Sequence, residues 1–481
     1  MASLKTITHE NLVRLGADRL ATLLVGFGDD SADVKRRLRL ELASEAGGQV
    51  IAAQISKRLA AIRTARSFLD WRKQRDFAKD LDLQRAMIVE RVAGVEPDLA
   101  LDLMWRFLDL AGPVLNRVDD SKGTIGDIFR TACEEIGIVA AGAGSDPVKL
   151  ADRVYAAISA NDWSIYDRLA EAMLPALGVG GIARLKERLT IALAEQQKSA
   201  SRPTRGDAYL QRALQAIADH EGDVDAFAAL IPLEDLSRPD VGAELGRRLL
   251  AAARVPEALA VLETARPGRR ARATPLQDAL LIGGYAFGQT IWEDVFLDAL
   301  EASDRGDDAQ ALRWRAFEER LSVMRLRDYL KRLPDFDDDE AKEKAMRHAL
   351  AYRSFSTALG FFCDWPEPAC AAKLAVTRHA EIDGNAYHLL GPAADLLDAR
   401  HPLAATVLRR AMIEYALNGA KHTRYKHAAR HLLECESLVP VIEDYGAFED
   451  HRAFVARLRV TNARKVGFWV QLDEMAGTGL S

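Results

Sequence analysis

Apolar residues recur along this chain at the spacing of an α-helix. Near the N-terminus they fall at Leu12, Val13, Leu15, Ala17 and Leu20, which form one broad stripe at 3.6 residues per turn. We find no convincing run of the alternating pattern that is typical of a β-strand. The pattern therefore predicts an all-α fold. The same spacing predicts further helices over 48–69, 98–117, 124–140, 147–159, 164–176 and 180–197.

The breaks between these helices are short and carry turn residues. They lie at 47–48, 119–123 and 142–147, and each contains glycine. Short connections make successive helices antiparallel, so we expect stacked helical hairpins. A longer polar segment at 196–206 lacks an apolar stripe. It predicts an N-terminal helical domain over 1–195, a linker over 196–206 and a second domain over 207–481.

Four segments of the second predicted domain share a pattern, in which an acidic residue or a proline is followed by alanines. They are 255–262, 307–312, 367–372 and 401–408. Small residues let two helices approach closely, as in the second helix of tetratricopeptide-type repeats. The equivalent alanines are 53, 60 and 33 residues apart, so a regular array is not supported. We expect an irregular α-solenoid that is tetratricopeptide-like in its C-terminal half.

Composition limits the class of protein. The chain has 481 residues, is 49% hydrophobic and has a formal net charge of -6, so it can bury a large core and is not uniformly basic. A local basic patch remains compatible with that balance. We expect no signal peptide, because the N-terminus lacks an apolar core region, and no membrane span, because the apolar runs are too short. Four scattered cysteines do not form a disulfide framework and favour a cytoplasmic location.

The densest chemistry lies at 421–431, where four permanent cations and three histidines occur in one predicted helix. Its apolar stripe would bury Tyr425 and Leu432, while Lys426 and Arg430 point away. The alternative is an ordinary solvated face with local ion pairs, such as Arg430 with Glu434. A second basic stretch lies at 57–75 and surrounds Trp71. The candidate residues for binding an anion, a peptide or a nucleic acid are Lys421, Arg424, Tyr425, Lys426, Arg430, Arg72 and Lys73.

A metal site is a separate hypothesis for the same helix. His427, His431 and Cys435 follow one another at four-residue intervals, so they share one face and could ligate zinc or copper. A closed zinc site needs a fourth ligand, and the sequence offers only distant histidines. The structural alternative is a buried Cys435 with the two histidines at the core boundary. We expect no other cofactor, because the sequence lacks the phosphate-binding, dinucleotide-binding and metalloprotease motifs.

Three segments carry a family resemblance. They are 98–122, 325–338 and 424–433, and together they resemble an uncharacterised bacterial family of large α-helical proteins. That family is similar to the helical region that follows the zinc finger in SWIM-type proteins. The resemblance implies a helical-repeat fold and no assigned activity. This chain lacks the Cys-x-Cys and Cys-x-His ligand pairs of a SWIM finger, so no zinc-finger function is implied.

The sequence thus predicts a non-enzymatic helical scaffold that binds a protein or a peptide. The alternative is a nucleic-acid-associated factor that uses the basic stretches at 57–75 and 421–431. An enzyme is the third possibility, because no pair of nucleophile and base and no pair of carboxylates stands out. The sequence leaves the oligomeric state open.

Overall fold

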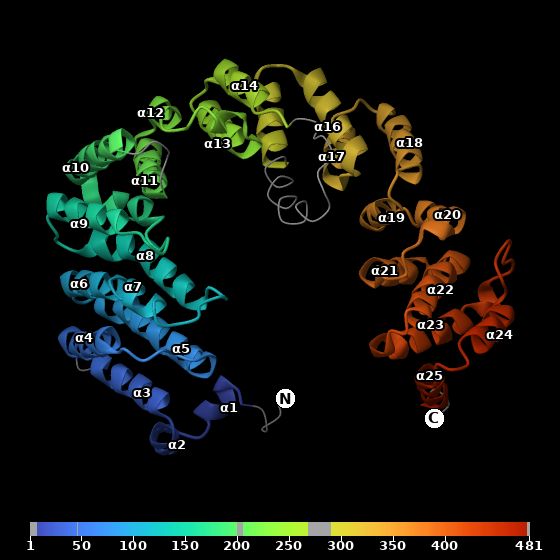
Figure 1. Ribbon diagram of the computed structural model, residues 1–481, viewed down its shortest axis with the longest axis horizontal. Helices are drawn as coiled ribbons and strands as arrows, with labels where there is room; N and C mark the ends of the chain where they lie inside the picture. The colour runs from blue at the N-terminus through green and yellow to red at the C-terminus, as the bar shows by residue number, and fades with distance from the viewer. Residues whose placement is uncertain (1–6, 46, 200–204, 268–289, 479–481) are drawn as a thin grey trace. The chain divides into compact units, whose positions relative to one another are not determined.

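The all-α prediction is confirmed. The computed structural model describes residues 7–45, 47–199, 205–267 and 290–478, and these residues form helices and no β-strand (Figure 1). Within these ranges, extended backbone pairs only at an isolated parallel bridge between Leu69 and Val118. None of the helices in these ranges has both the length and the apolar character needed to cross a membrane.

The chain divides into two compact units, Met1–Trp292 and Glu293–Ser481. The linker predicted at 196–206 lies inside the first unit. Its first four residues end helix α10, its last two begin helix α11, and residues 200–204 lie outside the described part. Because α10 packs directly against α11, the described residues around this segment share one core. The domain limits at 195 and 207 stay a prediction.

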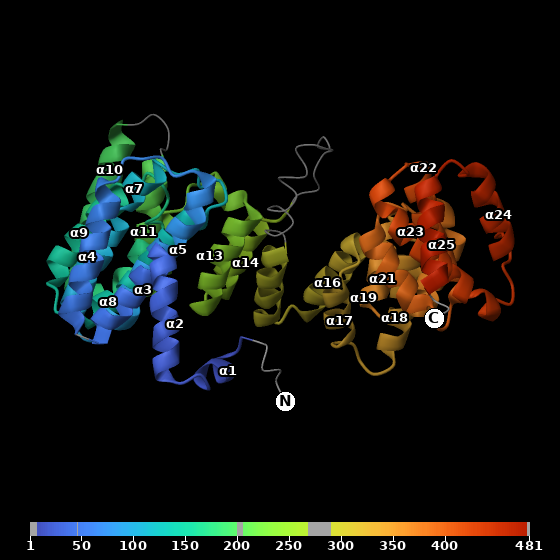
Figure 2. The same ribbon diagram turned by 90° about the horizontal axis from the view of Figure 1, so that it is seen from below.

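Helices of the first unit pack mainly against helices near them in the chain, as α6 against α8 and α8 against α10 (Figures 1 and 2). A single core runs from Leu40 to Ile217, and a smaller one joins α11 to α14. The helices are α1 (His9–Val13), α2 (Ala17–Asp30), α3 (Ala32–Glu45), α4 (Gly48–Thr64), α5 (Trp71–Met87) with a π-helical extension (Ile88–Val92), α6 (Pro97–Leu108), α7 (Ala111–Leu115), α8 (Thr124–Gly142), α9 (Pro147–Ser159), α10 (Leu169–Ser199), α11 (Arg205–Glu221), α12 (Val224–Ala229), α13 (Pro239–Ala251) and α14 (Val255–Thr264).

The second unit begins with the end of a helix at 293–302 and then repeats short helical hairpins. Two of its cores meet along α22, since one contains Leu408 and Met412 and the other begins at Ile413. The helices are α16 (Gly306–Arg320), α17 (Val323–Leu330), α18 (Asp337–Leu350), α19 (Phe355–Asp364), α20 (Pro368–Thr377), α21 (Tyr387–Leu397), α22 (Pro402–Asn418), α23 (Tyr425–Ser437), α24 (His451–Thr461) and α25 (Val466–Thr478). The helical hairpins agree with the predicted class, while the solenoid and tetratricopeptide details stay predictions.

The end of α22 fixes where the basic run begins. Ala420 adopts a left-handed backbone with φ 48°, and the Lys421 amide donates to the Ala416 carbonyl at 2.9 Å. The Ala420 amide donates to the Leu417 carbonyl at 3.1 Å. These two bonds form a Schellman motif, which satisfies the last carbonyls of the helix and reverses the chain. One 3₁₀ turn, His422–Arg424, follows before α23 begins at Tyr425, four residues later than the sequence predicted.

Candidate functional site

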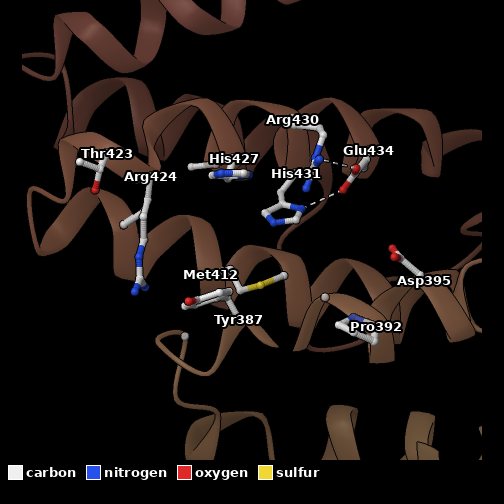
Figure 3. Close-up of a pocket in the computed structure, with 14 residues that line it drawn as sticks. Tyr387, Pro392, Asp395, Met412, Thr423, Arg424, His427, Arg430, His431 and Glu434 are labelled. Carbon is white, nitrogen blue, oxygen red and sulfur yellow. Dashed lines mark hydrogen bonds and ion pairs between the residues drawn. The ribbon is translucent and has the colours of Figure 1, made fainter. Parts of the chain in front are cut away.

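The basic run at 421–431 borders a cavity of about 570 Å³ in the second unit, which we call the α21–α23 cavity. Figure 3 shows side chains of α23 facing those of α21 and α22 across it. The helices α21, α22 and α23 pack against one another in this order, which encloses the space between them. Its lining residues are Gly384, Tyr387, Gly391, Pro392, Asp395, Met412, Ala416, Thr423, Arg424, His427, Ala428, Arg430, His431 and Glu434.

Arg424 forms the cationic end of the cavity. Its guanidinium lies 4.6 Å from the ring centroid of Tyr387 and 5.6 Å from that of Tyr415. It also donates to the side-chain oxygen of Asn385 at 2.9 Å. Among the described residues no carboxylate lies within ion-pair distance of it. Aromatic faces and one amide oxygen hold this guanidinium in place and leave its positive charge uncompensated.

Buried Arg409 organises the opposite, acidic end. Its guanidinium binds Glu434 at 2.9 Å, Asp395 at 2.8 Å and Asp398, although only 2% of the residue is exposed. Burial alone would lower the pKa of Arg409, but the hydrogen bond to Asp398 and the charges of Asp398 and Glu434 outweigh burial and raise it. Because three carboxylates surround one guanidinium, this end keeps an excess of negative charge. Arg424 and Asp395 lie at opposite sides of Figure 3.

The two histidines of α23 lie between these ends. His431 is half-buried, and its Nδ1 lies 2.8 Å from the Glu434 carboxylate. Burial lowers the pKa of His431 below its ordinary value, and this effect outweighs the Glu434 bond, which raises it. His427, one turn earlier, lines the cavity and is exposed. The centre of the cavity thus holds a neutral imidazole, bonded to Glu434, near neutral pH.

The pKa of His431 gives a pH dependence with a definite sign. Burial also lowers the pKa of His451, so for both residues the unfolded chain binds a proton at a higher pH than the folded chain. The free energy of unfolding should therefore fall as the pH drops through about 6.5 and level off below the folded pKa values. Urea unfolding from about pH 7.5 to about pH 5 measures this slope. His431→Gln should make the slope shallower, and an unchanged slope would contradict the assignment.

The structure brings together only part of the predicted binding set. Arg424 and Arg430 line the α21–α23 cavity, and Arg430 forms the expected ion pair with Glu434 at 3.4 Å. Lys421 and Lys426 are exposed and lie outside its lining. Tyr425 is buried in the core of α23 and α25, where its ring packs against Phe468, so the structure gives it a packing position.

The predicted metal ligands do not converge. Among the described residues there is no cluster of three or more His, Cys, Asp and Glu side chains that could hold a metal ion. Cys435 lies in the core, as the structural alternative predicted, and burial raises its pKa to about 12. The thiolate is the form that binds metals, so this thiol is a poor ligand near neutral pH. His427 and His431 face the cavity while Cys435 does not line it.

The second basic stretch belongs to the first unit. Lys57 and Arg63 on α4, Arg66 in the following loop and Lys73 on α5 are exposed, and no ion pair joins them to a described acid. We call these four residues the α4–α5 basic surface. The side chain of Arg72 lies outside the described part of the structure.

The loop within this basic surface is held in a defined position. The Leu69 amide donates to the Arg117 carbonyl at 3.0 Å, and Arg117 donates back to the Ser67 carbonyl at 3.1 Å. Phe68 lies in the chain between the two bonded residues, Ser67 and Leu69, and is 65% exposed. The loop therefore presents an aromatic side chain next to Arg66.

Sequence reasoning missed the α21 side of the cavity. Tyr387, Pro392 and Asp395 belong to a segment with no unusual composition, and nothing in it indicates that it faces α23. Arg409 gave a usable signal, because two consecutive arginines interrupt an otherwise apolar helix at 402–413. An arginine on a buried stripe requires acidic partners, and the structure supplies them as Asp395, Asp398 and Glu434.

A comparison with protein families decides the relationship that the sequence resemblance predicted. Residues 2–471 match the family of unknown function DUF6880. The chain belongs to this family. No curated protein and no solved structure matches the chain. Membership of DUF6880 agrees with the expected uncharacterised helical family and shows no relationship to SWIM-type proteins.

Proposed function

We propose that this DUF6880 protein is a non-enzymatic helical scaffold that binds a protein partner through an acidic segment in the α21–α23 cavity. The observation that carries the proposal is the position of Arg424, which lines a preformed cavity. Among the described residues this cation has no carboxylate partner. An acidic side chain of the partner would supply the missing charge. Tyr387, which is 57% exposed, would add apolar contact area beside it.

The size and the charge of the cavity support a segment of a few residues. A volume of about 570 Å³ lies within the range of sites that enclose a small ligand or several side chains. Asp395 and Glu434 at the other end favour a basic group of the same segment. Exposed Lys421, beside the 3₁₀ turn that carries Arg424, would attract an acidic partner during encounter.

The arrangement of polar groups supports binding over catalysis. The cavity contains the hydroxyls of Thr423 and Tyr387, and neither has a described hydrogen bond to a base. The Glu434 carboxylate, which is hydrogen-bonded to His431, instead accepts from buried Arg409. A nucleophile activated by a base is therefore not assembled among the described lining residues.

Charge reversal inside and outside the cavity tests this proposal. Wild-type protein, Arg424→Glu and Lys426→Glu would be immobilised, and proteins retained from a lysate of the source cells would be quantified by mass spectrometry. Both variants change the net charge equally, but only Arg424 lines the cavity. We expect Arg424→Glu to lower retention of a specific partner by about tenfold or more and Lys426→Glu to change it less than threefold. Equal losses in the two variants would contradict the proposal.

The α4–α5 basic surface favours a second candidate function, nucleic-acid binding. Four exposed cations and exposed Phe68 come from one stretch of the chain, 57–73, and would combine phosphate contacts with a ring on which a base can stack. Fluorescence anisotropy with a single-stranded oligonucleotide at several salt concentrations tests it. Replacing two of these cations, Lys57 and Lys73, by glutamine should make the slope of log K against log salt shallower by about 1.4, since each phosphate contact contributes about 0.7. Absence of salt-dependent binding by the wild type would rule this candidate out.

The finer predictions from sequence stand beside these proposals. The likeness to the helical region of SWIM-type proteins, the tetratricopeptide-like arrangement and the cytoplasmic location stay predictions. Neither proposed function depends on them, because each rests on side chains of one compact unit.

A further inference from the structure

Helix α2 presents an apolar stripe on the surface of the first unit. Leu20, Leu23, Leu24 and Phe27 follow the i, i+3, i+4, i+7 spacing, so they share one face of the helix. The last three are between 41% and 56% exposed, and the buried position of the helix is Gly28. Among the described helices only α3 packs extensively against α2. Folded proteins in water rarely leave such a stripe uncovered, so it indicates an interaction surface.

The stripe borders an open groove of about 520 Å³, which we call the α2–α3 groove. Leu24 and Phe27 form its α2 side, and half-buried Val34 and Leu38 form its α3 side. Most of the exposed wall of this groove is apolar, and its lining comes from these two helices and their connection alone. Figure 1 shows α2 at the edge of the first unit, on the side of α3 away from α4. The groove is therefore open to a further helix.

The groove carries one unpaired charge of each sign. Asp30 at the end of α2 and Arg37 on α3 both line it and are exposed, and neither forms an ion pair with another described residue. The other charged lining residue, Glu41, lies 3.6 Å from Arg91. An occupant with charge of one sign would leave Asp30 or Arg37 unpaired. A second copy related by a two-fold axis satisfies both, since each Asp30 can then face the other copy's Arg37.

We propose that the α2–α3 groove joins two copies of this chain in a symmetric dimer. Phe27 of each copy would enter the groove of the other and pack between Leu24 and Leu38, and two Asp30–Arg37 ion pairs would flank these contacts. Two short helices from each copy form a small interface, so we expect a dissociation constant on the order of 10 μM. The dimer is independent of the proposed partner site, because that cavity belongs to the second unit.

Sedimentation velocity of the full chain from about 1 to about 200 μM tests for the dimer. Leu24→Asp should weaken dimerisation about tenfold or more, because it places a carboxylate in the apolar contact. Val460→Asp is the matched control, since Val460 is an exposed apolar residue on α24 of the second unit, and it should change the affinity less than twofold. A wild type that stays monomeric over this range, or equal losses in the two variants, would overturn the proposal.

Charge reversal identifies a second copy as the occupant. Asp30→Arg and Arg37→Asp should each weaken self-association about tenfold or more, because each sets like charges against each other across the two-fold axis. An equimolar mixture of the two variants should dimerise within about threefold of the wild-type affinity, since every facing pair then has opposite signs. A mixture that associates no better than the separate variants would overturn the proposal. So would a monomeric wild type that loses a different protein on Leu24→Asp, because the groove would then belong to that protein.

Discussion

Replacing Arg409 by methionine is expected to lower the free energy of unfolding by roughly 3 kcal/mol, because it removes the cation that joins three carboxylates. Asp395, Asp398 and Glu434 would be left as like charges around an apolar side chain. The estimate lies at the lower end of the range for a broken buried pair, because 73% of the Asp395 side chain is exposed and can be hydrated. Urea unfolding followed by circular dichroism measures the change.

Arg430→Met is the matched control for Arg409→Met. Arg430 pairs with the same Glu434, at 3.4 Å, but 57% of its side chain is exposed. Its loss should cost about 1 kcal/mol or less, as for most surface ion pairs. Similar losses in the two variants would show that Arg409 does not organise the acidic end of the cavity.

Replacing Gly137 by alanine is expected to destabilise the first unit by about 2–3 kcal/mol, because backbone atoms occupy the place of the new methyl group. A Cβ at this position of α8 would lie 1.8 Å from the carbonyl oxygen of Ala172 and 2.6 Å from its carbon. Ala172 belongs to α10, so the two helices would have to move apart. This strain outweighs the gain of about 1 kcal/mol that alanine normally brings to a helix interior. A thermal unfolding scan of the variant measures the loss.

Gly26→Ala is the control for the glycine prediction. Gly26 lies inside α2, and a Cβ there would meet no atom within 4 Å. We expect this change to stabilise the protein by about 0.5–1 kcal/mol through helix propensity alone. If Gly137→Ala behaved like Gly26→Ala, the close approach of α8 and α10 would be wrong.

Local signals predicted helices well where the chain marks their ends. The helix predicted at 147–159 coincides with α9, because Asp146 caps it by accepting from the Lys149 amide and proline follows at its first position. The break predicted between 176 and 180 coincides with Gly178, whose φ of 56° interrupts α10. These features act over a few residues, so the sequence shows them directly.

The single helix predicted over 98–117 is wrong. The structure ends α6 at Leu108 and begins the short α7 at Ala111. Pro113 explains the break, since its ring excludes the carbonyl four residues earlier, at Asp109, from a continuous helix. Apolar spacing continues through this segment and conceals the proline, which shows that periodicity alone does not place helix ends.

The same contrast holds for the candidate site: the part that depends on residues close together in the chain was predicted, and the part that depends on distant segments was not. The buried stripe of α23 through Tyr425 and Leu432 follows from its own spacing and is confirmed. The cavity depends on Tyr387 and Asp395, which are about forty residues earlier in the chain. A contact between such segments depends on how helices pack, and a single sequence carries no direct signal of it.

Site-specific photo-crosslinking tests the central claim, that the α21–α23 cavity is where a partner binds. A photoreactive amino acid would replace exposed Thr423 in the cavity lining or, as a control, Val460 on α24, which is 81% exposed and lies outside it. After irradiation in the source cells, adducts would be identified by mass spectrometry. We predict a defined protein adduct at position 423, attached through an acidic segment and absent at position 460. The same adducts at both positions, or none at position 423, would contradict the claim.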